Sequence, residues 1–205
     1  MSVYRKINLL IGTCALSYVL SGCAGLSVGS NQLTPRVIMQ TELGNIVLEI
    51  DLENAPVTAT NFMKYVDEER YEGASFYRVV RMDNQPNKQV KIEVIQGGLQ
   101  FVEAPLDLAP IDHESTAVTG ILHEDGTLSM ARAEIGSASS EIFICIGDQP
   151  ELDFQGKRNP DGHGFAAFGR VVEGMEVVRK IQAGEADDQM LIEPVKILKV
   201  KRKLF

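Results

Sequence analysis

The stretch Ser75–Arg81 has the sequence SFYRVVR. Apolar residues alternate with others along it at a period of two, which is typical of a β-strand. Arg78 is the exception, because its neighbours along the run are aromatic or apolar. A guanidinium keeps its charge in proteins and carries five donors, so this side chain must face solvent or bind a partner. The run therefore predicts a strand that presents one cation to solvent or to a ligand.

Short β-prone runs with turn signals between them recur on both sides of this strand. Two amphipathic helices are also predicted, at 58–71 and 175–183, and the irregular region 101–126 is expected to be a functional loop or to contain a short helix. About eight strands and two helices predict a mainly β fold, a closed barrel whose open ends the helices cover. The other predicted strands are 37–41, 45–52, 92–95, 127–131, 141–146, 165–172 and 192–204.

Composition limits the possible functions. The chain has 205 residues and is 44% hydrophobic, which is enough for one well-buried domain. Its formal net charge is −8. An acidic protein is a poor partner for the phosphate backbone, so we expect no nucleic-acid binding.

The N-terminus has the features of an export signal. Two basic residues, Arg5 and Lys6, precede the mostly apolar stretch 7–20, which is too short for a typical membrane span. The stretch ends in Leu-Ser-Gly-Cys at 20–23, which resembles the lipobox of bacterial lipoproteins. This resemblance implies cleavage before Cys23 and lipidation of that residue. The expected organisation is a signal peptide at 1–22, a lipidated flexible tether at 23–35 and a globular domain at 36–205.

Cysteine use agrees with this organisation. Cys14 would leave with the signal peptide and Cys23 would carry lipid, so Cys145 would remain alone in the apolar run 142–146. No disulfide is then possible within the mature domain. We expect Cys145 to behave as a small buried hydrophobe, because nothing near it in sequence would lower the pKa of its thiol.

Six motifs in order carry a second resemblance. They are FYRVV at 76–80, IQGG at 95–98, GTLSMAR at 126–132, IFI at 142–144, LD at 152–153 and FGRVVEGMEVV at 168–178. Together they resemble the cyclophilin-type peptidyl-prolyl cis-trans isomerases, over nearly all of the mature chain. The resemblance implies an eight-stranded antiparallel barrel capped by two helices. It also implies proline-containing polypeptides as substrates, a monomer, and no cofactor or metal.

The resemblance also assigns roles to individual residues. Arg78 would donate to the nitrogen of a twisted X–Pro bond, and Gln96 would bind the substrate backbone. Phe143 would be the third catalytic residue, as a wall of the pocket for the proline ring. Ala131 would flank the residue before proline. The remaining walls of the proline pocket would come from Val94, Met130, Leu152 and Phe165.

Four positions depart from the family pattern. Glu93 stands where many members have an aromatic residue, Glu151 where they have Trp, Phe165 where they have His or Tyr, and Glu141 where Gln is frequent. Loss of the Trp implies weak cyclosporin binding. Two additional carboxylates near the groove would favour basic or polar peptide segments.

Three alternatives stay open beside an isomerase that assists the folding of exported proteins. One is a non-catalytic, membrane-tethered module that binds peptides or acts as a chaperone on the same barrel. Another is a hydrolase using Ser129 and a histidine, although Ser129 lacks the sharp turn that exposes a nucleophile. A metal site at His113 and His123 has no common ligand spacing. We expect the protein to lie in the bacterial cell envelope and to face the periplasm, with a lipid anchor in the outer membrane.

Overall fold

The computed structural model describes residue 1 and residues 34–103 and 107–203. The predicted signal peptide, Cys23 and nearly all of the predicted tether lie outside the described residues, so these assignments stay predictions. No helix in the described part of the chain is both long enough and apolar enough to cross a membrane.

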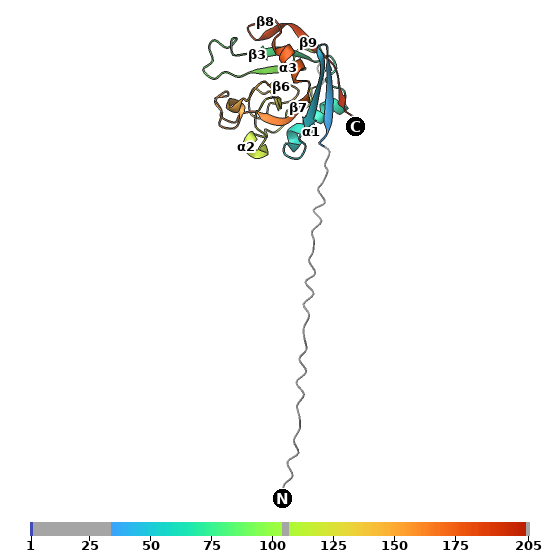
Figure 1. Ribbon diagram of the computed structural model, residues 1–205, viewed down its shortest axis with the longest axis vertical. Helices are drawn as coiled ribbons and strands as arrows, with labels where there is room; N and C mark the ends of the chain where they lie inside the picture. The colour runs from blue at the N-terminus through green and yellow to red at the C-terminus, as the bar shows by residue number, and fades with distance from the viewer. Residues whose placement is uncertain (2–33, 104–106, 204–205) are drawn as a thin grey trace. The chain divides into compact units, whose positions relative to one another are not determined.

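Eight antiparallel strands close into a barrel (Figure 1), as predicted from the sequence. Strand β1 pairs with both β2 and β9, and this second pairing closes the ring. A ninth strand, β8 (Ala186–Asp187), pairs with β9 as a two-residue arm that the sequence pattern did not predict. Around the barrel the strands follow in the order β1 (Arg36–Thr41), β2 (Gly44–Ile50), β7 (Ala166–Glu173), β5 (Thr127–Met130), β6 (Ile142–Cys145), β4 (Val94–Gly98), β3 (Ser75–Val80) and β9 (Met190–Arg202).

The two long helices pack at different places on the barrel. Helix α1 (Pro56–Asp67) packs against β7 and β9, and α3 (Met175–Gln182) against β2, β3 and β4. Figure 1 shows them towards opposite ends of the barrel. In the described part of the irregular region 101–126 there is one short helix, α2 (Thr116–Thr119). A 3-10 turn, η1 (Pro150–Leu152), follows β6.

Helix α1 ends four residues before the predicted end. Glu69 has a φ of 52°, in the left-handed region, so the chain leaves the helical path there. The backbone N–H of Arg70 then donates to the carbonyl of Tyr65 at 2.8 Å. Tyr71 turns back to become fully buried, and its hydroxyl donates to the carbonyl of Ser140 at 3.0 Å.

The strands near SFYRVVR bury both of their faces. Successive side chains on a strand point to opposite faces. On β6, Ile142 and Ile144 belong to the main core inside the barrel, whereas Phe143 and Cys145 face outward. The outward side chains form a second apolar group, which we call the outer cluster. It consists of Val80, Ile92, Val94, Phe143, Cys145 and Leu152, with Ala131 and Phe165 packed against it.

A β-bulge in β3 directs Arg78 outward. The register between β3 and β4 pairs Phe76 with Gly97 and then Arg78 with Gln96, so Tyr77 is the additional residue. Phe76 and Val79 lie in the main core. The bulge therefore allows the adjacent residues Tyr77 and Arg78 both to lie outside the barrel, which simple alternation would not allow.

Candidate active site

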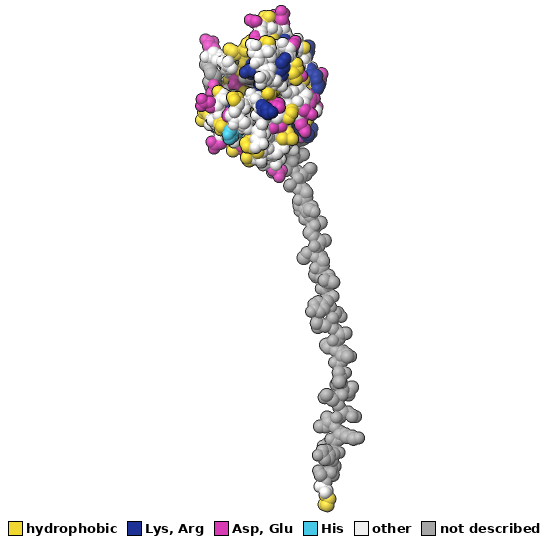
Figure 2. Space-filling view, turned by 90° about the vertical axis from the view of Figure 1, so that its left-hand side faces the viewer, with side chains coloured by type: hydrophobic (Ala, Val, Ile, Leu, Met, Phe, Trp, Pro, Cys, Tyr) yellow, Lys and Arg dark blue, Asp and Glu magenta, His cyan; other side chains and the backbone are white. Residues whose placement is uncertain are grey.

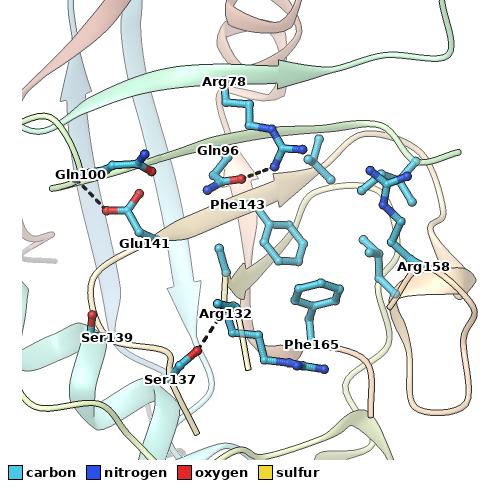
Figure 3. Close-up of a pocket in the computed structure, with 15 residues that line it drawn as sticks. Arg78, Gln96, Gln100, Arg132, Ser137, Ser139, Glu141, Phe143, Arg158 and Phe165 are labelled. Carbon is cyan, nitrogen blue, oxygen red and sulfur yellow. Dashed lines mark hydrogen bonds between the residues drawn. The ribbon is translucent and has the colours of Figure 1, made fainter. Parts of the chain in front are cut away.

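A pocket of about 410 Å³ lies on the outer face of the barrel, over the outer cluster. Figure 3 shows Arg78, Gln96 and Phe143 in its middle, with Gln100 and Glu141 at one end and Arg158 at the other. These side chains come from strands β3, β4 and β6 and from two loops. The site thus combines rigid strand positions with loop residues.

Three hydrogen bonds fix the guanidinium of Arg78. Its Nη1 donates to Gln96 Oε1 at 2.7 Å. Its Nε and Nη2 donate to Gln189 Oε1 at 3.1 and 2.6 Å. Burial lowers the pKa of Arg78, but an arginine remains charged after a modest shift. The pocket therefore contains a cation whose orientation is set by two neutral amides.

A chain of hydrogen bonds continues from Gln96. Its Nε2 donates to the hydroxyl oxygen of Tyr77 at 2.9 Å. The Tyr77 hydroxyl lies within hydrogen-bonding distance of Glu141 Oε2 and of Gln100 Oε1, and it can donate to one of them at a time. Burial, and then the hydrogen bond to Glu141, raise the pKa of Tyr77 well above its ordinary value. Tyr77 is therefore a neutral donor and acceptor that connects Gln96 to Glu141.

Apolar side chains form the floor of the pocket below Arg78. The rings of Phe143 and Phe165 lie edge to face, with centroids 5.4 Å apart and an interplanar angle of 90°. Val94, Leu152 and Ala131, three of the residues named for the pocket above, also line it.

One predicted wall residue lies elsewhere. Met130 is fully buried in the main core inside the barrel, and the structure does not bring it to the pocket. The reason is strand geometry, because Met130 and Ala131 are adjacent and point to opposite faces. Ala131 lines the pocket, so Met130 cannot.

The two carboxylates expected near the groove do not line it either. Glu93 approaches the amide of Gln182 at 3.4 Å, and the residues of this segment that line the pocket are its two neighbours, Ile92 and Val94. Glu151 accepts a hydrogen bond from the backbone N–H of Lys157 at 2.8 Å and so stabilises its own loop. Glu141 is the one carboxylate among the described lining residues.

Three arginines line the pocket, and sequence reasoning identified only Arg78. Arg132 and Arg158 lie in or beside long loops, where no periodicity predicts the direction of a side chain. Gln189, which holds Arg78, belongs to the turn between β8 and β9, and no pattern in the sequence indicates its role.

Arg132 is an internal part of the pocket wall. Its guanidinium forms a bidentate ion pair with Asp161 at 2.7 and 2.9 Å and also donates to the carbonyl of Gly164. Its side chain is 1% exposed, and its guanidinium carbon lies 5.2 Å from the ring centroid of Phe165. The pair fixes both the loop and the Phe165 ring.

Ser129, His123 and Asp153 form a chain of side-chain contacts behind the pocket. His123 Nδ1 lies 2.7 Å from Asp153 Oδ1, and its Nε2 lies 3.0 Å from Ser129 Oγ. The imidazole stacks on Phe143, with centroids 5.8 Å apart. The arrangement has the residue types of a hydrolytic triad, but Ser129 is 0% and His123 1% exposed. A substrate carbonyl cannot reach this serine, so the contacts support the ring of Phe143 instead.

The other potentially reactive or metal-binding side chains that the structure describes do not form a second site. Cys145 is buried in the outer cluster, and burial raises the pKa of its thiol. Among the described residues, no three His, Cys, Asp or Glu side chains are grouped so that they could hold a metal ion. Figure 2 shows acidic and basic side chains interspersed over one face of the domain.

Comparison with known sequences agrees with this geometry. The family model described as cyclophilin type peptidyl-prolyl cis-trans isomerase matches residues 36–202. A peptidyl-prolyl cis-trans isomerase of Acinetobacter baylyi is 33% identical over 87% of this chain and 92% of its own. Peptidyl-prolyl cis-trans isomerase A of Dickeya dadantii is 37% identical over 74% of this chain and 73% of its own.

Comparison with solved structures gives the same fold. A cyclophilin type peptidyl-prolyl cis-trans isomerase of Cryptosporidium parvum, solved in the presence of the dipeptide Ala-Pro, superposes with a TM-score of 0.67. The match covers 83% of this chain and 99% of that chain at 18% identity.

Proposed function

The chain belongs to the cyclophilin type peptidyl-prolyl cis-trans isomerase family, and we propose that its pocket catalyses rotation about X–Pro bonds through Arg78. Isomerisation of such bonds is the activity for which its relatives are named. We infer the role of Arg78 from the position of its guanidinium, which two glutamines hold over an apolar pocket.

The chemistry follows from the peptide bond. Partial double-bond character gives rotation a barrier of roughly 20 kcal/mol, so uncatalysed turnover takes tens to hundreds of seconds. Twisting the bond removes this conjugation and localises the lone pair of the proline nitrogen. A donor aimed at that nitrogen binds the twisted bond more strongly than either planar form, and this difference lowers the barrier. One hydrogen bond from a charged donor contributes about 1.5–3 kcal/mol, or roughly ten- to a hundredfold in rate.

The other pocket residues have supporting roles in this proposal. The rings of Phe143 and Phe165 and the side chains of Val94 and Leu152 provide an apolar surface for the proline ring. Gln96 binds the substrate backbone through its side-chain amide. The hydrogen bonds of this amide to Arg78 and Tyr77 fix its orientation. None of these steps requires a nucleophile.

The decisive experiment measures prolyl isomerisation by the purified protein and by its Arg78→Ala variant. We expect acceleration by the protein and a loss of most of it in the variant, with an unchanged circular dichroism spectrum. Arg179→Ala is a matched control, because Arg179 is an exposed arginine paired with Asp125 outside the pocket. No acceleration by a folded protein that still binds proline peptides would instead support the non-catalytic binding module.

For the cellular role, we propose that Cys23 is lipidated and that the lipid anchors the protein in the outer membrane. The domain then faces the periplasm, where it assists the folding of exported proteins. The support is the sequence Leu-Ser-Gly-Cys at 20–23 after an apolar run. Cys23→Ser is expected to abolish partitioning into the detergent phase. Continued partitioning of this variant would contradict the lipidation.

A further inference from the structure

Two of the three arginines that line the pocket have no carboxylate partner in the described part of the chain. Arg132 forms a bidentate pair with Asp161, whereas no ion pair joins Arg78 or Arg158 to any described residue. Building on the proposed function, we propose that Arg158 forms a subsite for a carboxylate on the substrate peptide, one or two residues from the proline. The substrates favoured by this site would then be X–Pro segments with an acidic neighbour.

The guanidinium of Arg158 is held by neutral acceptors. Its Nη1 donates to Gln85 Oε1 at 2.9 Å and to the carbonyl of Val90 at 2.8 Å. Gln85 is itself 1% exposed, and its Nε2 donates to the carbonyls of Arg81 and Ile92 at 2.7 and 2.8 Å. The loop 81–91 thus supports Arg158 from behind without neutralising its charge.

The remaining donors of Arg158 are free for a ligand. Neither Nε nor Nη2 donates to an acceptor among the described residues, and the side chain lines the pocket. A guanidinium presents its donors in a fixed planar arrangement that matches the two oxygens of a carboxylate. Because Nη1 is already fixed, binding an anion would cost little side-chain entropy.

Arg158 and Arg78 also influence each other. Burial, and then the charge of Arg78, lower the pKa of Arg158. Two cations facing one pocket repel each other, and an anion between or beside them relieves this repulsion. Asp188 acts on Arg78, but no carboxylate has a comparable effect on Arg158.

The two ends of the pocket carry opposite charges. Glu141 lies at the end opposite Arg158, with Arg78 and Phe143 between them (Figure 3). An extended peptide advances about 3.3 Å per residue, so a proline over Phe143 brings a residue one or two positions away to either end. An acidic residue is therefore favoured on the Arg158 side and opposed on the Glu141 side.

The test uses peptides blocked at both ends, so that the side chain supplies the only carboxylate. Four pairs of peptides carry either Glu or Gln, at one or two positions after the proline and at one or two positions before it. Isomerisation is followed by NMR exchange, and binding of the same peptides by chemical-shift titration. We expect one flank to favour Glu over Gln about three- to tenfold in kcat/KM at low salt, and less as salt is added.

Arg158→Gln is expected to remove this preference, and Lys157→Gln to retain it. Lys157 is the matched control because it is adjacent, exposed and outside the pocket lining, so it gives the same change in net charge. Equal rates and affinities for Glu and Gln on both flanks, or an unchanged preference in Arg158→Gln, would overturn the subsite. The titration reports the preference even if no peptide is isomerised, so failure of the proposed activity is distinguishable from failure of the subsite.

Discussion

The side-chain oxygen of Gln189 accepts two hydrogen bonds from Arg78, at 3.1 Å from Nε and 2.6 Å from Nη2. Gln189 lies in the turn between β8 and β9, far from Arg78 in sequence. Its own Nε2 donates to the carbonyl of Asn84 at 3.2 Å. The orientation of the guanidinium therefore depends on a short hairpin and on a surface loop as well as on Gln96.

Gln189→Ala is expected to lower kcat of isomerisation about three- to tenfold while KM changes little. The variant loses an acceptor that orients Arg78, and orientation matters most in the transition state. The backbone carbonyl of Gln189 still accepts from Val79 N–H at 2.8 Å, so the hairpin should remain in place. Steady-state kinetics measures the split between kcat and KM.

Gln189→Glu provides the conservative comparison, because it keeps an oxygen at the same distance along the side chain. It should recover most of the lost kcat. An equal loss in both variants would show that Gln189 supports the loop rather than the guanidinium.

Strand periodicity predicted the barrel well, because buried residues alternate with less buried ones along strands such as β1. It did not predict the bulge at Tyr77, since an additional residue changes the face of everything after it without changing the composition. The same periodicity, applied to Met130 and Ala131, indicates that only one of them can face the pocket. The assignment of Met130 to the pocket came from resemblance and disagrees with that alternation.

The charge of the pocket was the part of the site that the sequence predicted least well. The sequence suggested additional carboxylates at Glu93 and Glu151, whereas the structure lines the pocket with Arg132 and Arg158. The long loop at 82–91 directly precedes this segment, and both neighbours of Glu93, Ile92 and Val94, line the pocket. Side chains that are positioned by contacts between loops follow no periodic rule, so only coordinates reveal them.

Ser129→Ala is expected to leave isomerase activity within about twofold and to destabilise the fold by about 1 kcal/mol. The hydroxyl is fully buried and its one described side-chain partner is His123, so its loss removes one internal hydrogen bond. Urea unfolding measures the change in the free energy of unfolding. Hydrolysis of an activated ester by the protein that disappears in this variant would contradict a purely structural role.

Glu141→Gln is expected to lower the pKa of Tyr77 while leaving it above the ordinary value for tyrosine. Burial is the main cause of the raised pKa and persists in the variant, whereas the hydrogen bond to a carboxylate and its negative charge are removed. Absorbance of the phenolate during alkaline titration measures this, and Tyr77→Phe assigns the signal. An unchanged titration would show that Glu141 does not act on Tyr77.

The Arg132–Asp161 pair is expected to make the stability of the fold depend on pH in the acidic range. The hydrogen bonds from Arg132, and then the backbone N–H of His163, lower the pKa of Asp161 to about 2. An aspartate in the unfolded chain has a pKa of about 3.9. Because the folded pKa is the lower one, the unfolded state binds a proton first as pH falls, so the pair stabilises the fold fully above about pH 4 and progressively less towards pH 2.

Asp161→Asn tests this dependence. The free energy of unfolding of the variant should lie below that of the natural protein at pH 7, and the difference between them should shrink between about pH 4 and pH 2. Asp83→Asn is the matched control, since Asp83 is an exposed aspartate whose contact with Arg81 is longer, at 3.4 Å. A difference that stays constant down to pH 2 would mean that the asparagine disturbs the loop by its shape, and that the ion pair contributes nothing that titrates.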